Sequence, residues 1–127
     1  MPSVLIADDE VDLARLTRMR LDAAGLDAVE CYDGSTALQI LRESRPAVAI
    51  LDWMMPGMDG LELARLVRAD DALKNTRLIL MTARVEAETE EGFAERHGFD
   101  VVLIKPVPRA DLIATVLSEL QAARVGA

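Results

Sequence analysis

The sequence has few of the features that mark secreted or membrane-bound proteins. It contains one cysteine, Cys31, so an intramolecular disulfide and a cysteine metal site are both excluded. No apolar run approaches the roughly 18 residues that a membrane-spanning helix needs. The acidic stretch Asp8-Asp9-Glu10 interrupts the apolar run near the N-terminus, so the features of a signal peptide are missing. We therefore expect a reduced, cytoplasmic setting with no membrane contact.

Basic residues are also scarce. The 127 residues include 14 Lys and Arg against 22 Asp and Glu, which gives a formal net charge of −8 at pH 7. This balance leaves no basic surface to neutralise phosphates, so we expect no direct nucleic acid binding. A hydrophobic content of 51% is enough for a buried core and argues against a disordered chain. The length fits a single domain that spans residues 1–127.

What the sequence does contain is a regular alternation of short apolar runs with longer helical stretches. The apolar runs predict strands at 3–7, 28–31, 47–51, 78–81 and 101–104. The other stretches predict helices that end near residue 24, stop at Pro46, and span 60–69, 86–97 and 109–123. Such alternation is typical of a parallel sheet covered by helices on both faces. The predicted fold class is therefore α/β.

Polar side chains follow four of the predicted strands. They are Asp8 and Asp9 after the first strand, Asp52 after the third, Thr82 after the fourth and Lys105 after the fifth. The carboxyl ends of parallel strands lie at one edge of the sheet, where ligands bind in such folds, so these groups can converge. Three adjacent carboxylates repel one another unless a cation lies among them. Oxygen ligands of this kind suit Mg²⁺.

This set of groups is sufficient for a domain that phosphorylates itself on an aspartate. A carboxylate such as Asp52 can attack phosphorus and form an aspartyl phosphate. Phosphoryl transfer depends mainly on positioning and charge stabilisation, which Mg²⁺ and the ammonium of Lys105 can supply. The hydroxyl of Thr82 can donate a hydrogen bond to a phosphoryl oxygen.

Several short motifs together resemble the receiver domain of two-component response regulators. They are Asp8-Asp9, Asp52 with Met55-Pro56-Gly57-Met58-Asp59-Gly60 after it, Thr82-Ala83 and Lys105-Pro106. The resemblance covers nearly the whole chain, and each motif stands at the end of a predicted strand. It implies a CheY-like, flavodoxin-like fold, which is a doubly wound five-stranded parallel sheet in the order 2-1-3-4-5 with five helices.

The resemblance also implies a metal site. Asp52 would be the phosphoacceptor and would bind Mg²⁺ or Mn²⁺ together with Asp9. Asp8 would hold the cation through a water molecule, and Met54 would bind it through the backbone carbonyl. These roles follow from the resemblance and not from the spacing of the residues.

In such a receiver domain, Thr82 and Lys105 would contact the phosphoryl group, and the Lys105–Pro106 bond would be cis. The phosphoryl group would come from a phosphohistidine on a sensor histidine kinase or a histidine phosphotransfer protein. Phosphorylation would alter the surface of the last two predicted helices and the strand between them, where a downstream protein binds. The expected protein is a signalling switch, monomeric or weakly dimeric when phosphorylated, and not an enzyme that turns over a separate substrate.

The chain departs from the common family pattern near its output surface. Val102 stands where the family usually has an aromatic residue, and Val107 replaces a frequent phenylalanine. The stretch from Thr82 to Lys105 is also one residue longer than usual. Because valine has a stiff side-chain dihedral and no ring, a switch based on ring rotation cannot work at position 102 in the usual way.

Two other functions fit parts of the pattern. A magnesium-dependent phosphatase with an aspartyl nucleophile uses similar chemistry, but some such enzymes carry Asp-x-Asp after the first strand and this chain has adjacent aspartates. A flavodoxin-like flavin carrier shares the fold class, but it needs a phosphate loop rich in hydroxyl groups and glycine where this chain has Asp8-Asp9-Glu10. Turnover of a phosphate ester, or a bound yellow cofactor, would distinguish these alternatives from a receiver domain.

Overall fold

The computed structural model describes residues 3–125, and within this range the chain forms five strands and six helices. The strands are β1 (Val4–Ala7), β2 (Ala28–Cys31), β3 (Val48–Leu51), β4 (Arg77–Thr82) and β5 (Val101–Ile104). The helices are α1 (Val11–Ala23), α2 (Gly34–Ser44), α3 (Gly60–Ala69), α4 (Glu86–Thr89), α5 (Phe93–His97) and α6 (Arg109–Val125). The outermost residues of the predicted domain, 1–2 and 126–127, lie outside the described range.

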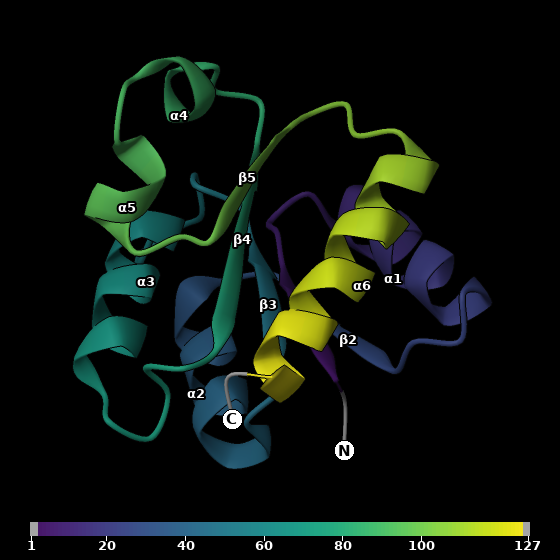
Figure 1. The fold of residues 1–127 in the computed structure, drawn as a ribbon, viewed down its shortest axis with the longest axis horizontal. Helices are drawn as coiled ribbons and strands as arrows, with labels where there is room; N and C mark the ends of the chain where they lie inside the picture. Colours follow the sequence, from purple (N-terminus) through teal and green to yellow (C-terminus); the bar gives the residue numbers. More distant parts are fainter. Residues whose placement is uncertain (1–2, 126–127) are drawn as a thin grey trace.

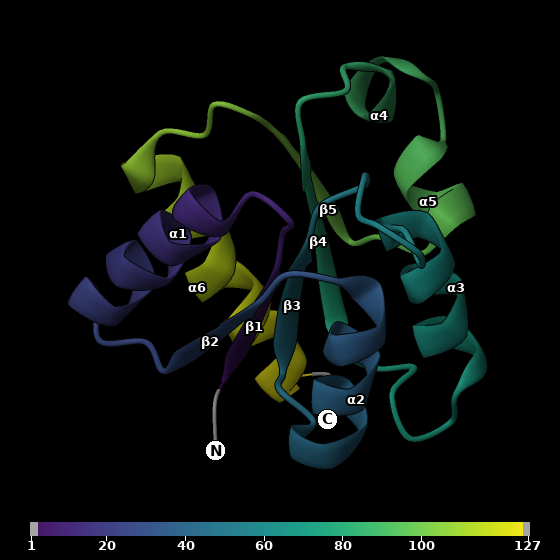
Figure 2. The same ribbon diagram turned by 180° about the vertical axis from the view of Figure 1, so that it is seen from behind.

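Across the described residues the strands form a parallel sheet in the order β2-β1-β3-β4-β5, as predicted; Figure 1 shows the sheet, and Figure 2 labels all five strands. Ala7 pairs with Leu51, and Leu51 pairs with Leu80, so the carboxyl ends of β1, β3 and β4 lie close together. The side chains of β1 and β3 are buried along the whole strand, whereas those of β5 at the sheet edge are half-buried. The uniformly apolar runs predicted these central strands because a strand covered on both faces has no polar side.

Helices cover both faces of the sheet, so alternate side chains of a strand enter different cores. α2, α3, α4 and α5 pack on one face, and α1 and α6 pack on the other (Figure 2). In β1, Leu5 and Ala7 join the first core while Val4 and Ile6 join the second, with the period of two that a strand imposes. This is the predicted doubly wound arrangement. Among the helices described, none combines the length and the apolar character that crossing a bilayer requires.

The prediction of one helix over residues 86–97 is wrong, because this segment forms the two short helices α4 and α5. Gly92, with a φ of 74°, separates them. Ala87 and Phe93 are both buried, but two residues six apart in a continuous helix point about 120° away from each other. A break between them lets both side chains face the core, and glycine adopts the required left-handed conformation without a steric penalty. The described chain therefore has six helices where five were predicted.

Candidate functional site

The polar residues that follow the strands meet at the carboxyl edge of the sheet. Asp8 follows β1, Asp52 follows β3, Lys105 follows β5, and Thr82 is the last residue of β4. Asp8, Asp52 and Thr82 are buried. The backbone N–H of Asp52 donates to the carbonyl of Ala7 at 2.9 Å, so the parallel pairing continues up to the site. The fold thus brings together residues that are up to 97 positions apart in sequence.

The ammonium of Lys105 lies between two buried carboxylates. Its Nζ is 2.8 Å from Oδ2 of Asp8 and 3.0 Å from Oδ2 of Asp52, and it is 3.5 Å from Oε1 of Glu10. The Lys105 side chain is only 11% exposed, so these carboxylates are its main partners. The Lys105–Pro106 peptide bond is cis, as the resemblance predicts.

Burial and ion pairing act in opposite directions on the site carboxylate. Burial raises the pKa of Asp52 to about 6, although the hydrogen bond from Lys105 opposes this change. Burial lowers the pKa of Lys105, but the hydrogen bonds to Asp8 and Asp52 outweigh burial, so this pKa lies above its usual value. At neutral pH, Lys105 is therefore charged, and Asp52 is mostly ionised but more basic than an ordinary aspartate.

Three carboxylate groups at this edge could hold a metal ion. Asp8, Glu10 and Asp52 each offer one oxygen, and these oxygens all lie within 4.8 Å of one another. Three negative charges face the single positive charge of Lys105, so a divalent cation would balance the cluster. Oxygen donors of this kind fit Mg²⁺ or Mn²⁺. The donor set is therefore suited to the cation that the resemblance implies.

Glu10 is not among the site residues that the sequence predicts. The chain turns after Asp8, where the N–H of Glu10 donates to Oδ1 of Asp8 at 2.9 Å, and this turn places Glu10 near Lys105. Asp9 is exposed and lies outside the three-carboxylate group found among residues 3–125. Its predicted role as a metal ligand stays a prediction, as does that of the Met54 carbonyl. Glu10 directly follows Asp8 and Asp9 in the sequence, and this third adjacent carboxylate was a signal that could have indicated its place in the site.

Two exposed side chains stand beside the loop that follows Asp52. Met54 follows Asp52 by two residues and is 55% exposed. Nη1 of Arg84 lies 3.7 Å from Sδ of Met54, and its guanidinium carbon lies 4.3 Å from the centroid of the Trp53 ring. The backbone N–H of Arg84 also donates to Oγ1 of Thr82 at 3.1 Å. Arg84 therefore connects the ends of β3 and β4.

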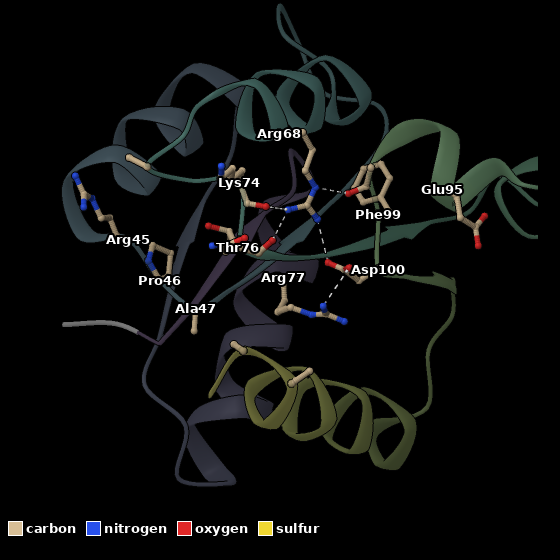
Figure 3. A pocket seen from close by; sticks show the side chains of 15 residues that line it. Arg45, Pro46, Ala47, Arg68, Lys74, Thr76, Arg77, Glu95, Phe99 and Asp100 are labelled. Carbon is tan, nitrogen blue, oxygen red and sulfur yellow. Dashed lines mark hydrogen bonds and ion pairs between the residues drawn. The ribbon is translucent and has the colours of Figure 1, made fainter. Parts of the chain in front are cut away.

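A groove of about 690 Å³ lies at the opposite, amino-terminal edge of the sheet (Figure 3). Arg68 crosses it and donates hydrogen bonds to the carbonyls of Gly98, Lys74 and Thr76, at 2.8, 2.7 and 2.7 Å respectively. Arg68 also pairs with Asp100, at 3.0 Å. Because its guanidinium is committed to these groups, Arg68 acts as a clamp between loops and not as a free ligand-binding cation.

Comparison with known proteins identifies relatives of the chain. The family model described as "Response regulator receiver domain" matches residues 4–117. "Phosphate regulon transcriptional regulatory protein PhoB" of Rhizobium meliloti is 34% identical over 125 residues, which cover 98% of this chain and 54% of that protein. "DNA-binding response regulator MtrA" of Mycobacterium tuberculosis is 31% identical over 118 residues, or 93% of this chain and 50% of that protein. The chain thus spans about half the length of these relatives.

Solved structures show the same fold. The receiver domain of the Francisella response regulator 1452 superimposes with a TM-score of 0.86 at 30% identity, covering 96% of this chain and 98% of that one. The chemotaxis response regulator CheY4 of Vibrio cholerae gives a TM-score of 0.84 at 28% identity, covering 94% of this chain and 98% of that one.

Proposed function

The chain belongs to the response regulator receiver domain family, and on this premise we propose that Asp52 is the residue that accepts a phosphoryl group. The observation that carries the proposal is the buried pair of Asp52 and Lys105, whose carboxylate and ammonium lie 3.0 Å apart at the carboxyl edge of the sheet. The acceptor needs a carboxylate that is ionised yet basic, and burial gives Asp52 that character. The domain then acts as a phosphorylation-dependent signalling switch.

In the proposed reaction, an Asp52 carboxylate oxygen attacks the phosphorus of a phosphohistidine on a sensor histidine kinase or a histidine phosphotransfer protein. The new P–O bond forms as the P–N bond breaks, and the imidazole leaves. Lys105 donates from its ammonium and Thr82 from its hydroxyl to the phosphoryl oxygens, where negative charge must be held. Thr82 ends β4 and Lys105 directly follows β5, so both stand at the same edge of the sheet as Asp52.

The proposed cation is Mg²⁺ or Mn²⁺. Asp8 and Asp52 would hold it, with Glu10 facing the same space and with Asp9 and the Met54 carbonyl as the further proposed ligands. When bound, the cation supplies positive charge that offsets the charge of the phosphoryl oxygens.

We further propose that the output of the switch is a protein contact in a cytoplasmic setting. The surface concerned is formed by α4, α5, β5 and α6, which together correspond to the predicted output surface. MtrA and PhoB are described as DNA-binding and transcriptional regulators. For this chain, whose net charge is −8, we propose a downstream protein partner and no direct contact with nucleic acid. The proposed state is a monomer or a weak, phosphorylation-linked dimer.

Labelling with a small phosphodonor tests the acceptor. With Mg²⁺ and acetyl phosphate, the protein is expected to gain one acid-stable, base-labile phosphate on Asp52, located by mass spectrometry of its peptides. Asp52→Asn is expected to abolish the label, and EDTA is expected to block it. Labelling of the Asn variant to the level of the wild type would refute the assignment.

A further inference from the structure

A continuous stack of side chains runs from the candidate site to α5. The guanidinium carbon of Arg84 lies 4.3 Å from the centroid of the Trp53 ring. The Trp53 and Phe93 rings have centroids 5.1 Å apart, and the Phe93 and His97 rings have centroids 4.5 Å apart, each pair inclined at 45°. These separations are within the range of direct cation–π and aromatic contacts. We call these four side chains the aromatic stack.

The aromatic stack is joined to the candidate site at two points. Trp53 directly follows Asp52 in the chain. The backbone N–H of Arg84, and not its guanidinium, donates to Oγ1 of Thr82 at 3.1 Å, so this bond fixes the backbone that carries the Arg84 side chain. If the Thr82 hydroxyl moves toward a phosphoryl group on Asp52, as the proposed function requires, the hydrogen bond to Arg84 is disturbed. A new dianion beside Trp53 also attracts the Arg84 guanidinium away from the ring.

The far end of the aromatic stack lies in a short helix. α5 has five residues and is bounded by Gly92 and Gly98, whose φ angles of 74° and 81° are both left-handed. Only Phe93 of this helix is fully buried. Phe93 is the buried anchor of α5, and Arg68 holds only its C-terminal end, through the Gly98 carbonyl at 2.8 Å. The N-terminal part of this short helix, next to Gly92, can therefore be displaced without unfolding its neighbours.

We propose that phosphorylation of Asp52 is transmitted to α5 through the aromatic stack, an inference that rests on the proposed function of Asp52. Position 102 on β5 is a valine, so no aromatic ring can rotate there to transmit the change. The aromatic stack transmits it instead. His97, the last member, lines a groove of about 640 Å³ next to α3, so displacement of α5 changes the shape of an exposed surface. The surface that reports phosphorylation is therefore centred on α5 and not on β5.

Amide hydrogen exchange with and without Mg²⁺ and beryllofluoride, a phosphoryl mimic, tests this path. In the wild type, exchange across residues 83–98 is expected to change by roughly tenfold, with changes under about twofold across 101–104. Phe93→Leu keeps an apolar side chain but removes the ring, and the change in exchange across 93–98 is expected to fall below about twofold. Phe99→Leu is the matched control, since Phe99 is equally buried in the same core but is not part of the stack.

A variant at an exposed position keeps the test valid if Phe93→Leu does not fold. Arg84→Ala removes a side chain that is 46% exposed, and it is also expected to abolish the change in α5. Arg42→Ala, another exposed arginine in an ion pair, is expected to leave the change as in the wild type. Binding of beryllofluoride is measured separately on every variant by ¹⁹F NMR.

Hydrogen exchange and beryllofluoride binding together distinguish failure of the path through the aromatic stack from failure of the proposed function of Asp52. A wild type that binds no beryllofluoride and takes no phosphoryl group contradicts the proposed function of Asp52. A Phe93→Leu or Arg84→Ala protein that binds the mimic and still shows the full change in α5 overturns the path through the stack. A larger change across 101–104 than across 83–98 overturns it as well.

Discussion

Lys105 is the residue on which the charge balance of the site depends. Its ammonium contacts Asp8 at 2.8 Å and Asp52 at 3.0 Å, yet the pKa of Asp52 is still raised to about 6. Burial is the larger effect, because the low-polarity surroundings penalise the charged form more than one shared ammonium favours it. The folded protein therefore holds an ionised Asp52 at a cost in stability.

This cost predicts how stability depends on pH. The pKa of Asp52 is raised from 3.8 to about 6 on folding, so between these values the folded state binds a proton more tightly than the unfolded state. The contribution of Asp52 to the free energy of unfolding is therefore favourable at low pH and is lost as pH rises through about 6. Without a divalent metal, the melting temperature of Asp52→Asn is expected to exceed that of the wild type at about pH 7.5 and to approach it near about pH 4. An equal difference at both pH values would contradict this explanation.

Met54 is expected to set the lifetime of the phosphorylated form. Hydrolysis requires a water aligned behind phosphorus, and the Met54 thioether, 3.7 Å from Nη1 of Arg84, offers such a water no strong hydrogen bond. We expect slow decay of the wild type and a several-fold faster decay of Met54→Asn, whose amide can orient the water. Phosphate release after removal of the donor measures both rates. Met19→Asn, at a methionine on α1 that is 54% exposed, is the control. Slower or unchanged decay of Met54→Asn would contradict the idea that Met54 shields the phosphoryl group from water.

At the scale of elements, the strands were predictable and the segment after β4 was not. β1 and β3 lie within one residue of their predicted bounds because a strand that is buried on both faces is apolar along its whole length. The segment 86–97 has the composition of an acidic surface helix, and its break depends on the need to bury Phe93 against Trp53, a residue 40 positions earlier. The burial of Phe93 against Trp53 is a matter of tertiary packing, but Gly92 inside the predicted helix was a local signal that the helix could break there.

The candidate site shows the same division. The resemblance and the strand ends indicated Asp8, Asp52, Thr82 and Lys105, because a parallel sheet places its carboxyl ends at one edge. The position of Glu10 depends on the conformation of a loop, which the spacing of residues does not determine.

The loops at the amino-terminal edge of the sheet are held by Arg68 from α3. Its guanidinium donates to the carbonyls of Gly98 and Thr76 and pairs with Asp100. Arg68→Ala removes the side-chain donor of the Gly98 and Thr76 carbonyls, while Asp100 keeps Arg77 and the backbone N–H of Leu78 as partners. The variant is expected to lower the free energy of unfolding by about 2–3 kcal/mol in urea titrations. Arg65→Ala removes an exposed pair with Glu62 and is expected to lower the free energy of unfolding much less than Arg68→Ala does. Equal losses in the two variants would show that Arg68 is not a clamp.

At the scale of the whole molecule, the two ends of the parallel strands have different roles. From β1 the chain continues to β2 on one side and then crosses back to β3 on the other side of β1. The winding direction therefore reverses between β1 and β3, and the carboxyl ends of these two strands border the crevice where ligands bind in such sheets. Asp8 and Asp52 follow these central strands and are the most enclosed acids of the site, while Lys105 reaches in from the edge strand β5. Phosphoryl chemistry is thus proposed at the carboxyl edge, and the Arg68 clamp stabilises the amino edge.

Trp53 is also an intrinsic fluorescent probe of the candidate site. The sequence contains one tryptophan, so the indole emission of the entire molecule comes from a single ring. That ring directly follows Asp52, lies beneath the Arg84 guanidinium and contacts Phe93. A trace of tryptophan fluorescence recorded during mixing with a phosphodonor therefore reports events around the loop that follows Asp52 in real time and without a dye.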